Sequence, residues 1–447
     1  MSDRLVVNEH YLNRLVEAGE TRGVEATEDI VSGTGVKLVA KGAAIDARTR
    51  DRLLQHKLLK PLEAVTRVVG GVASRPMDEV ARALIHRHSL LGSLCDAGRA
   101  QVIEEAFVSL RLTVSLESLL TLYADQGPNK LEHAVSVSLI AAALLLEVEP
   151  TRPLQPMLIA GLMHDIGELY IDPAILAPGS RMTPDQWKHV AVHPVVAANL
   201  LAELPGAGPA VAQAVLHHHE RLDGFGYPRA VRNEGLPLAG QVLGMAEALT
   251  GVIESGRDPG RRAGVMLKLM GHEFDRRLLD RVSRASKTGT DAESAEEPLS
   301  EDGLLAKAAT LSTQLVALLR MHEQLSAAKH STALTELMGK VQERQKRLSQ
   351  TLSSAGLNLG SNVPMHDYLG PMDAPVRYEI SVVLRELEWR VRELNRELLW
   401  RSERLEAAER QLLCKAVAEH LEPALNGTAA AAGPAPAADP VDERQAA

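Results

Sequence analysis

Apolar residues recur every three or four positions from Met77 to Val282, as in Leu110, Val114 and Leu119. This spacing puts them on one face of a helix. Aromatic residues make up only 3% of the 447 residues, so the cores must be built mainly from Leu, Ala and Val, a composition that favours packed helices. We therefore expect a mainly α protein with a helical domain over residues 71–285.

The N-terminal part of the chain has a different pattern. Two β-prone segments, residues 23–30 and 36–42, flank the sequence SGTG, which is typical of a hairpin turn. Asp46 is placed to cap a helix that follows them. The sequence predicts a small β-containing module over residues 1–70.

The C-terminal part of the chain is predicted to be helical again. A polar linker over residues 286–301 leads into a helical region over 302–425, and the Ala/Pro-rich tail 426–447 is expected to be disordered. Leucines over residues 384–412 follow a heptad pattern, which favours a coiled coil and a homodimer through the C-terminal helices. The alternative is one amphipathic helix that packs against its own chain.

Charge and cysteine content restrict the environment and the partners. With 49 Lys+Arg against 58 Asp+Glu, the net charge of -9 argues against duplex nucleic acid as a partner. Two cysteines, Cys95 and Cys414, lie far apart in sequence and favour a reducing, cytoplasmic setting. The apolar stretch Val135–Val148 is too short to span a bilayer, so no membrane anchor is expected.

Histidines concentrate in the middle of the chain, with seven of the sixteen between residues 133 and 219. Imidazole is the commonest metal ligand in proteins, and imidazoles mixed with carboxylates suit Fe and Mn. His164-Asp165 and the run His218-His219-Glu220 are the densest candidates for a metal centre. His189 and His217 are more simply explained as surface or helix-packing residues.

Three motifs together resemble the HD-GYP branch of the HD phosphohydrolases: HDIG from His164, His193-Pro194, and HHERLDGFGYP from His218. The resemblance covers roughly residues 105–285. It implies a helical bundle that holds two divalent ions, or three in some members, usually Fe or Mn. It also implies a phosphodiesterase that opens cyclic di-GMP to the linear dinucleotide and then to GMP, with water activated by the metals.

The resemblance also assigns roles to individual residues. The implied metal ligands are His133, His164, Asp165, His193, His218, His219 and Glu247. The implied catalytic residues are His164 and Asp165, and the implied substrate-binding residues are Asp223, Gly224, Gly226, Tyr227 and Pro228. Outside the family pattern, Glu168 is added as a catalytic candidate and Arg257 as a substrate-binding candidate.

The chain departs from the family pattern at positions that bear on activity. Glu168 stands where the family usually has a lysine that is expected to contact the substrate phosphate. Because Glu168 follows His164 by four residues, a continuous helix would make it an additional metal ligand. Asn129 replaces a glutamate that some three-metal members have, so two ions are expected. Arg257 is a candidate replacement for the lysine, and a solvated loop is the alternative.

These departures leave a second hypothesis open. In it the chain is a catalytically weak or inactive HD-GYP-like signalling adaptor, which acts by binding a signalling protein. The change to Glu168 favours the adaptor. The complete set of His and Asp positions and the intact GYP string favour the enzyme.

Overall fold

The computed structural model describes residues 6–72, 77–177, 183–254, 258–288, 299–354, 357 and 373–421. Arg257, the tail 426–447 and most of the linker 286–301 lie outside these residues. The chain divides into two compact units, Met1–Glu296 and Glu297–Ala447, which we describe separately.

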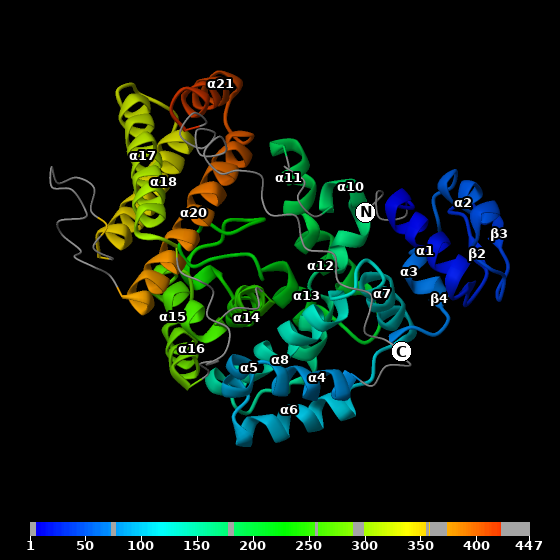
Figure 1. Ribbon diagram of the computed structural model, residues 1–447. Coiled ribbons are helices and arrows are strands. Elements are labelled where there is room, and N and C mark those ends of the chain that lie inside the picture. The colour runs from blue at the N-terminus through cyan, green and yellow to red at the C-terminus, as the bar shows by residue number, and fades with distance from the viewer. Residues whose placement is uncertain are drawn as a thin grey trace. The chain divides into compact units, whose positions relative to one another are not determined.

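The first unit begins with the small N-terminal module, drawn in blue in Figure 1. Its elements are α1 (Glu9–Thr21), β1 (Val24–Ala26), β2 (Ile30–Val31), β3 (Lys37–Val39), α2 (Ala47–Leu54), α3 (Leu62–Val65) and β4 (Thr66–Val68). Strands β2 and β3 form the expected antiparallel hairpin, whereas β1 pairs with the distant β4. Asp46 caps α2 through a capping box with Thr49. The module therefore has two short strand pairs instead of one hairpin.

A helical domain follows the module in the same unit. Its helices are α4 (Met77–Arg87), α5 (Ser89–Leu94), α6 (Ala97–Ser109), α7 (Val114–Ala124), α8 (Lys130–Val148), α9 (Gln155–Met163), η3 (Ile166–Tyr170), α10 (Pro173–Leu176), α11 (Pro184–Ala191), α12 (His193–Glu203), α13 (Pro209–Leu216), η4 (Asn233–Gly235), α14 (Leu238–Glu254), α15 (Pro259–Leu269) and α16 (Arg276–Thr288). The mainly α prediction is confirmed.

Helix α8 forms the centre of this domain and packs against α9 and α14. Residues on all of its sides are buried, which explains why its sequence is apolar almost throughout. Gly161 allows α9 to approach closely, because a Cβ atom there would lie 2.4 Å from the Cα of Ser138 on α8. The Ser138 hydroxyl donates a hydrogen bond to the Leu158 carbonyl across the same contact, at 2.9 Å.

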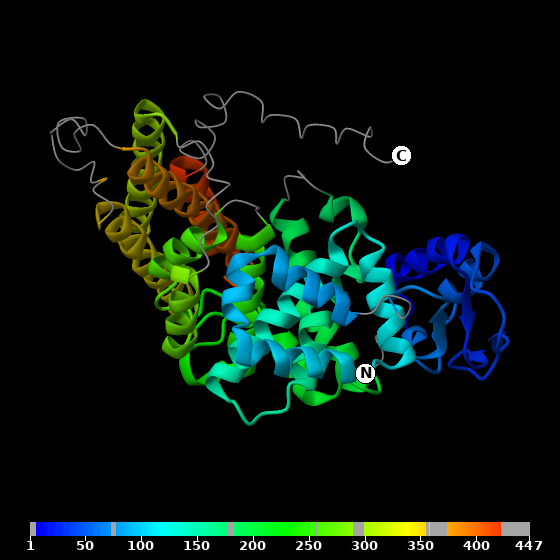
Figure 2. The ribbon, with the colours of Figure 1, turned by 60° about the horizontal axis from the view of Figure 1, so that its bottom comes forward.

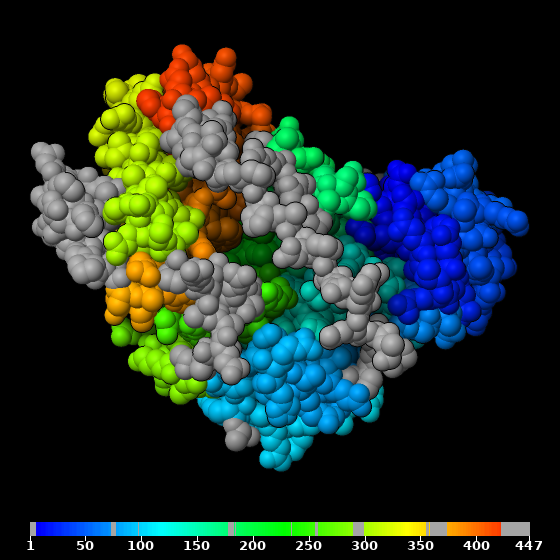
Figure 3. Space-filling view, viewed as in Figure 1, coloured from blue at the N-terminus to red at the C-terminus, as the bar shows by residue number. Residues whose placement is uncertain are grey.

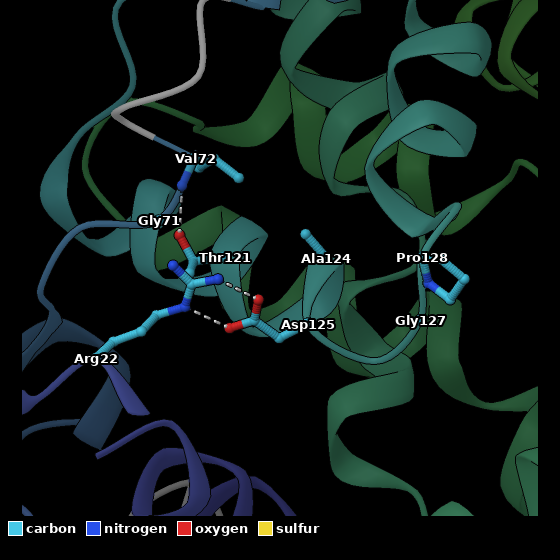
Figure 4. Close-up of a pocket in the computed structure, with 8 residues that line it drawn as sticks. All are labelled: Arg22, Gly71, Val72, Thr121, Ala124, Asp125, Gly127 and Pro128. Atoms are coloured by element: carbon cyan, nitrogen blue, oxygen red, sulfur yellow. Dashed lines mark hydrogen bonds and ion pairs between the residues drawn. The ribbon is translucent and has the colours of Figure 1, made fainter. Parts of the chain in front are cut away.

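The module and the helical domain are joined by polar contacts as well as by a shared apolar core. Figures 1 and 2 show the module at one side of the domain. The Arg22 guanidinium donates two hydrogen bonds to the Asp125 carboxylate, at 3.0 and 2.8 Å, as Figure 4 shows. Beside this ion pair the backbone N–H of Val72 donates to the Thr121 hydroxyl, at 3.2 Å.

The second unit is a packed group of helices. They are α17 (Glu301–Ser326), α18 (Thr332–Ser354), α20 (Ala374–Ser402), α21 (Ala407–Ala416) and the short π-helical turn η5 (Val417–Leu421). Helix α20 contacts both α17 and α18. The heptad residues of α20 are no more than 1% exposed; they are Leu384, Leu387, Val391, Leu394 and Leu398.

A coiled coil over residues 384–412 is not confirmed by this structure, which has no continuous helix across them. Helix α20 ends at Ser402, and Leu412 on the next helix is 38% exposed. The heptad leucines instead pack within their own chain, which was the alternative interpretation. The same apolar period suits both arrangements, so the sequence pattern did not separate them.

Two helices within the described residues, α8 and α17, are long and apolar enough to cross a membrane by length and composition alone. The number rises to three if the bent pair α6 and α7 is counted as one span. Of the apolar windows in α8 and α17, 78% and 44% are buried inside the protein. The expectation that the stretch Val135–Val148 is too short therefore underestimated α8, which begins at Lys130.

Candidate metal centre

The structure brings all seven candidate metal ligands together in two overlapping groups. One group is His133, His164, Asp165 and Glu247, and the other is Asp165, His193, His218 and His219. Within each group, the candidate ligand atoms lie within 4.8 Å of one another.

Asp165 belongs to both groups because its two carboxylate oxygens point in different directions. Its Oδ2 lies 3.2 Å from His164 Nε2, and its Oδ1 lies 3.2 Å from His193 Nε2. The Tyr123 hydroxyl donates a hydrogen bond to Oδ2 at 3.3 Å. A carboxylate held in this way has the arrangement of a ligand that bridges two cations.

The ends of several helices converge to form this cluster. His164 and Asp165 lie between α9 and η3, His193 is the first residue of α12, and His218 follows the end of α13. The glycine of the HDIG motif permits this convergence. A Cβ atom at Gly167 would lie 2.2 Å from the His193 carbonyl oxygen, so a side chain there would push α12 and its histidine away.

Backbone carbonyls orient three of the imidazoles. In His164, His193 and His218, Nδ1 donates a hydrogen bond to the carbonyl oxygen three residues earlier, at 2.8, 2.8 and 2.6 Å. Because a carbonyl only accepts, Nδ1 carries the proton, and in a neutral ring Nε2 presents its lone pair to the cluster. Such hydrogen bonds are typical of metal-binding histidines.

The donor set requires positive charge inside the cluster. Nε2 of His193 lies 3.3 Å from Nε2 of His218, which would bring two lone pairs together if both rings were neutral. The Glu247 Oε2 atom is buried and makes no hydrogen bond with the described residues, although His164 Nε2 is only 3.1 Å away. Imidazole nitrogens and carboxylate oxygens in this arrangement fit divalent metal ions.

The pKa values of the cluster reflect the same need for positive charge. Burial opposes the protonation of His133, but Glu247 and Glu254 outweigh it and raise its pKa to about 10. The pKa of His164 is likewise raised, since Asp165 and Glu247 overcome the effect of burial. Burial lowers the pKa of His218 to about 4.

Glu254 is a functional candidate that sequence reasoning missed. Its Oε1 accepts a hydrogen bond from His133 Nδ1 at 2.9 Å, while His133 Nε2 faces the cluster. Glu254 lies seven residues after Glu247 on α14, so the two carboxylates share one helix face. The seven-residue spacing between Glu247 and Glu254 is the sequence signal from which Glu254 could have been predicted to lie near the cluster.

Glu168 is not part of either group, and the expectation that it is an additional ligand is not supported by the structure. Helix α9 ends at Met163 and the 3₁₀ helix η3 begins at Ile166, so the helical spacing from His164 is lost. The Glu168 carboxylate instead accepts a hydrogen bond from the Lys130 ammonium at 2.8 Å. Lys130, which sequence reasoning missed, also lies 4.8 Å from the centre of the Tyr123 ring.

The buried Glu220 is likewise directed away from the metal ligands. Its carboxylate accepts hydrogen bonds from the backbone N–H groups of Arg229 and Val231, at 2.6 and 3.0 Å. The loop that carries the GYP residues is therefore fastened to the end of α13. Gly226 packs against the same residue, since a Cβ atom there would lie 2.3 Å from the Glu220 Cα.

The predicted substrate-binding loop lies beside the cluster. The Tyr227 ring stacks on the His219 ring with centroids 4.5 Å apart. Asp223 Oδ1 accepts a hydrogen bond from the Phe225 N–H at 3.0 Å, and Gly224 has a positive φ of 76° that favours glycine. Pro228, which follows Tyr227 in the sequence, is buried. The loop is thus placed next to the second ligand group.

The two histidines that sequence analysis set aside lie outside both groups. His189 is exposed on α11. His217 is buried, and its Nδ1 donates to the Gln213 carbonyl at 2.8 Å, as expected of a helix-packing residue.

Comparison with known proteins gives matches over this region. The HD domain family matches residues 117–281. A cyclic di-GMP phosphodiesterase of Pseudomonas aeruginosa is 31% identical over 170 residues, covering 37% of this chain and 41% of that protein. A cyclic di-GMP phosphodiesterase response regulator of Xanthomonas campestris is 26% identical over 254 residues, covering 54% and 63%. A 3'3'-cGAMP-specific phosphodiesterase of Vibrio cholerae is 26% identical over 247 residues, covering 51% and 53%.

The chain thus spans between 41% and 63% of the length of these relatives. A solved structure of an HDG"Y"P protein from Bdellovibrio bacteriovorus covers 61% of this chain, and 97% of that chain is matched, at 13% identity. The TM-score of this match is 0.31. Residues 117–281 of the chain thus match the HD domain family, and the motifs gathered in the cluster resemble those of its HD-GYP branch.

Proposed function

We propose that the helical domain hydrolyses a phosphodiester bond of cyclic di-GMP and releases the linear dinucleotide. The observation that carries the proposal is the position of Asp165, whose two carboxylate oxygens each face a group of imidazoles. Divalent ions bound there would lower the pKa of water and neutralise charge on phosphate oxygens.

We propose two ions, with Fe or Mn as the metal. His133, His164, Asp165 and Glu247 would hold one ion, and Asp165, His193, His218 and His219 the other. Mixed imidazole and carboxylate ligands suit both metals. A third ion is not favoured, because Asn129 is exposed and Glu168 is bound to Lys130.

The protein's own groups would keep the ligands in place during the reaction. The backbone carbonyls hold the Nδ1 protons of His164, His193 and His218, so each ring keeps Nε2 directed at the cluster. The Tyr123 hydroxyl fixes Oδ2 of Asp165. The GYP loop, stacked on His219 through Tyr227, would orient the substrate beside the cluster.

The names of the relatives support the substrate class. Two are cyclic di-GMP phosphodiesterases and a third is specific for 3'3'-cGAMP. All are enzymes for cyclic dinucleotides. Together with the complete ligand set, this favours the enzyme over the signalling adaptor, in which binding of a protein partner would replace catalysis.

One experiment tests the proposal directly. Purified full chain is loaded anaerobically with Fe or Mn, its metal content is measured, and cyclic di-GMP and 3'3'-cGAMP are added separately. We expect metal-dependent conversion of cyclic di-GMP to the linear dinucleotide, with loss of activity in a chelator. Two bound ions without turnover of either substrate would instead support the adaptor.

We further propose a cytoplasmic location and keep a homodimer as a prediction. Because the heptad leucines of α20 are buried in their own unit, a dimer would need other surfaces of the C-terminal helices. Light scattering on the full chain measures the mass and decides between monomer and dimer.

A further inference from the structure

A second cavity lies away from the metal centre, where the N-terminal module meets the helical domain. Its volume is about 780 Å³, within the range that holds a small organic ligand. The module contributes Tyr11, Leu58 and Leu62 to its lining, and the domain contributes Tyr170, Val196 and Leu200. Figure 3 shows the surface of the module, in blue, against the helical domain. The lining is mainly apolar, so a ligand would gain by burying apolar surface there.

One carboxyl group in the lining has little support from the protein. Glu63 is only 7% exposed, and its carboxyl group accepts hydrogen bonds from the Tyr170 hydroxyl and from its own backbone N–H. Burial raises the pKa of Glu63. Burying a carboxyl group with so few partners is costly, which is characteristic of groups kept for binding.

The charges around the cavity restrict the ligand further. The lining includes the carboxyl groups of Glu9, Glu63 and Glu203. Glu9 is paired with Arg50, at 2.7 Å. The ammonium group in the lining is that of Lys60. That ammonium is already bound to Glu28, at 2.7 Å. A phosphate or carboxylate ligand would lie against the buried Glu63 carboxyl group, whereas an amine would find an acceptor there.

We propose that this cavity binds a small amphiphile, with an apolar body lying against the tyrosines and leucines and an amine that is received by Glu63. The rings of Tyr11 and Tyr170, stacked 5.1 Å apart and nearly parallel, both line the cavity and provide apolar surface for an aromatic body. The amine would donate to the Glu63 carboxyl group, which accepts from the Tyr170 hydroxyl through Oε1. Neither requirement depends on catalysis by the metal centre.

The lining elements connect the cavity to the metal centre. Tyr170 is the last residue of η3, which begins directly after Asp165. Helix α12 begins with His193, and its next turns carry Val196 and Leu200 into the cavity wall. Since η3 also contacts α12, a ligand that shifts either element changes the spacing between Asp165 and His193. The bound amphiphile is therefore a regulator of the metal site.

Isothermal titration of the full chain with tryptamine, tryptophol and indole-3-acetate tests the binding. These probes share an indole body and differ in having an amine, a hydroxyl or a carboxylate. We expect tryptamine to bind at least tenfold more tightly than indole-3-acetate. Equal affinities, or no binding of any probe, would overturn the proposal.

Variants locate the binding in this cavity. Glu63→Gln keeps the size of the side chain and should weaken tryptamine about tenfold while changing tryptophol less than threefold. Leu200→Trp fills the cavity and should weaken all three probes. The control Glu105→Gln removes an exposed carboxylate on α6 and should change nothing. If tryptamine binds Glu63→Gln as tightly as the unaltered chain, Glu63 is not its acceptor and the proposal fails.

Coupling to the metal centre has its own readout. We expect the tryptamine affinity to change at least threefold when the protein is loaded with Mn²⁺, because binding linkage is reciprocal. The Asp165→Asn variant should lose this dependence on metal while still binding tryptamine. An identical affinity with and without Mn²⁺ would overturn the regulatory part. Failure of cyclic di-GMP hydrolysis would leave these binding results unaffected, so the two proposals are tested separately.

Discussion

The Glu168 carboxylate lies 2.8 Å from the ammonium group of Lys130. Lys130 precedes the candidate ligand His133 by three residues. The Glu168 and Lys130 side chains are 15% and 34% exposed, so the pair is partly shielded from water. Glu168 also follows Asp165 by three residues, and the pair therefore links the two segments that carry these candidate ligands. The acidic residue at position 168 is thus neutralised locally, and it is not directed at the metal cluster.

A charge swap tests the role of this pair. Glu168→Lys puts a second ammonium beside Lys130, and we expect it to lower the free energy of unfolding by about 1.5–3 kcal/mol, the usual contribution of a hydrogen bond to a charged group. The double variant Lys130→Glu with Glu168→Lys should recover most of that loss. Chemical denaturation measures both, with Glu168→Gln as the neutral control. A single Glu168→Lys variant as stable as the unaltered chain would show that the pair has no structural role.

The shared position of Asp165 leads to a prediction about metal stoichiometry. Asp165→Asn should remove both ions, because one carboxylate serves both groups. His189→Ala, which alters an exposed histidine outside both groups, should keep the full metal content. Elemental analysis of the purified variants measures the ratio of metal to protein. Loss of only one ion in Asp165→Asn would mean that Asp165 does not bridge.

Glu254→Gln tests a residue that contacts a candidate ligand but is not itself a candidate ligand. Because Glu254 contacts His133 at Nδ1 and not at the cluster side, its loss should weaken metal binding about 10–100-fold without removing a ligand. Metal content should therefore return to that of the unaltered chain at saturating metal concentration. A permanent loss of one ion would instead identify Glu254 as a ligand.

The sequence identified the residues that the structure groups in the candidate site, but not the residues that surround them. The HDIG and HHERLDGFGYP motifs contain short spacings that are set by local backbone geometry, and the structure brings His164, Asp165 and His218 together. Lys130 and Glu254 were missed because each acts on a residue far away in sequence, 38 and 121 positions respectively. Glu168 was misplaced because a helix was assumed to continue through Asp165.

The fold shows the same difference between local and distant information. Helical periodicity identified the mainly α domain, and the cap at Asp46 was found from its own neighbours. The pairing of β1 with β4 depends on a contact between distant segments, for which two short strands carry no sequence signal. The cavity beside Glu63 likewise depends on how the module packs against α12, and no motif indicates it.

Glu397 in the second unit predicts a pH dependence of stability. Burial raises its pKa to about 7, even though Arg401 pairs with it at 2.8 Å. A raised carboxyl pKa means that the folded state favours the protonated form. The stability from this group is therefore full below its ordinary pKa of about 4.5 and is lost as the pH rises to about 7.

Glu397→Gln should flatten that pH profile, because an amide resembles the protonated acid and does not titrate. Denaturation followed by the fluorescence of Trp389 and Trp400 measures this unit when the third tryptophan, Trp187, is replaced by Phe in every variant. The exposed Glu336→Gln on α18 is the matched control and should keep the original profile. The same slope between pH 5 and about 7 in Glu397→Gln would contradict the assignment.

The heptad leucines of α20 provide a test of how the second unit is held together. Leu394 is 0% exposed, and α20 contacts α17 and α18. Leu394→Ala removes buried methyl groups and leaves a cavity, so we expect a loss of about 2–5 kcal/mol in stability. Trp389→Ala, at a position that is 49% exposed on the same helix, should cost much less. Light scattering should give both variants the mass of the unaltered chain, because the leucines are buried by contacts within one chain. A mass that halves in Leu394→Ala without a loss of stability would show that these leucines join two chains.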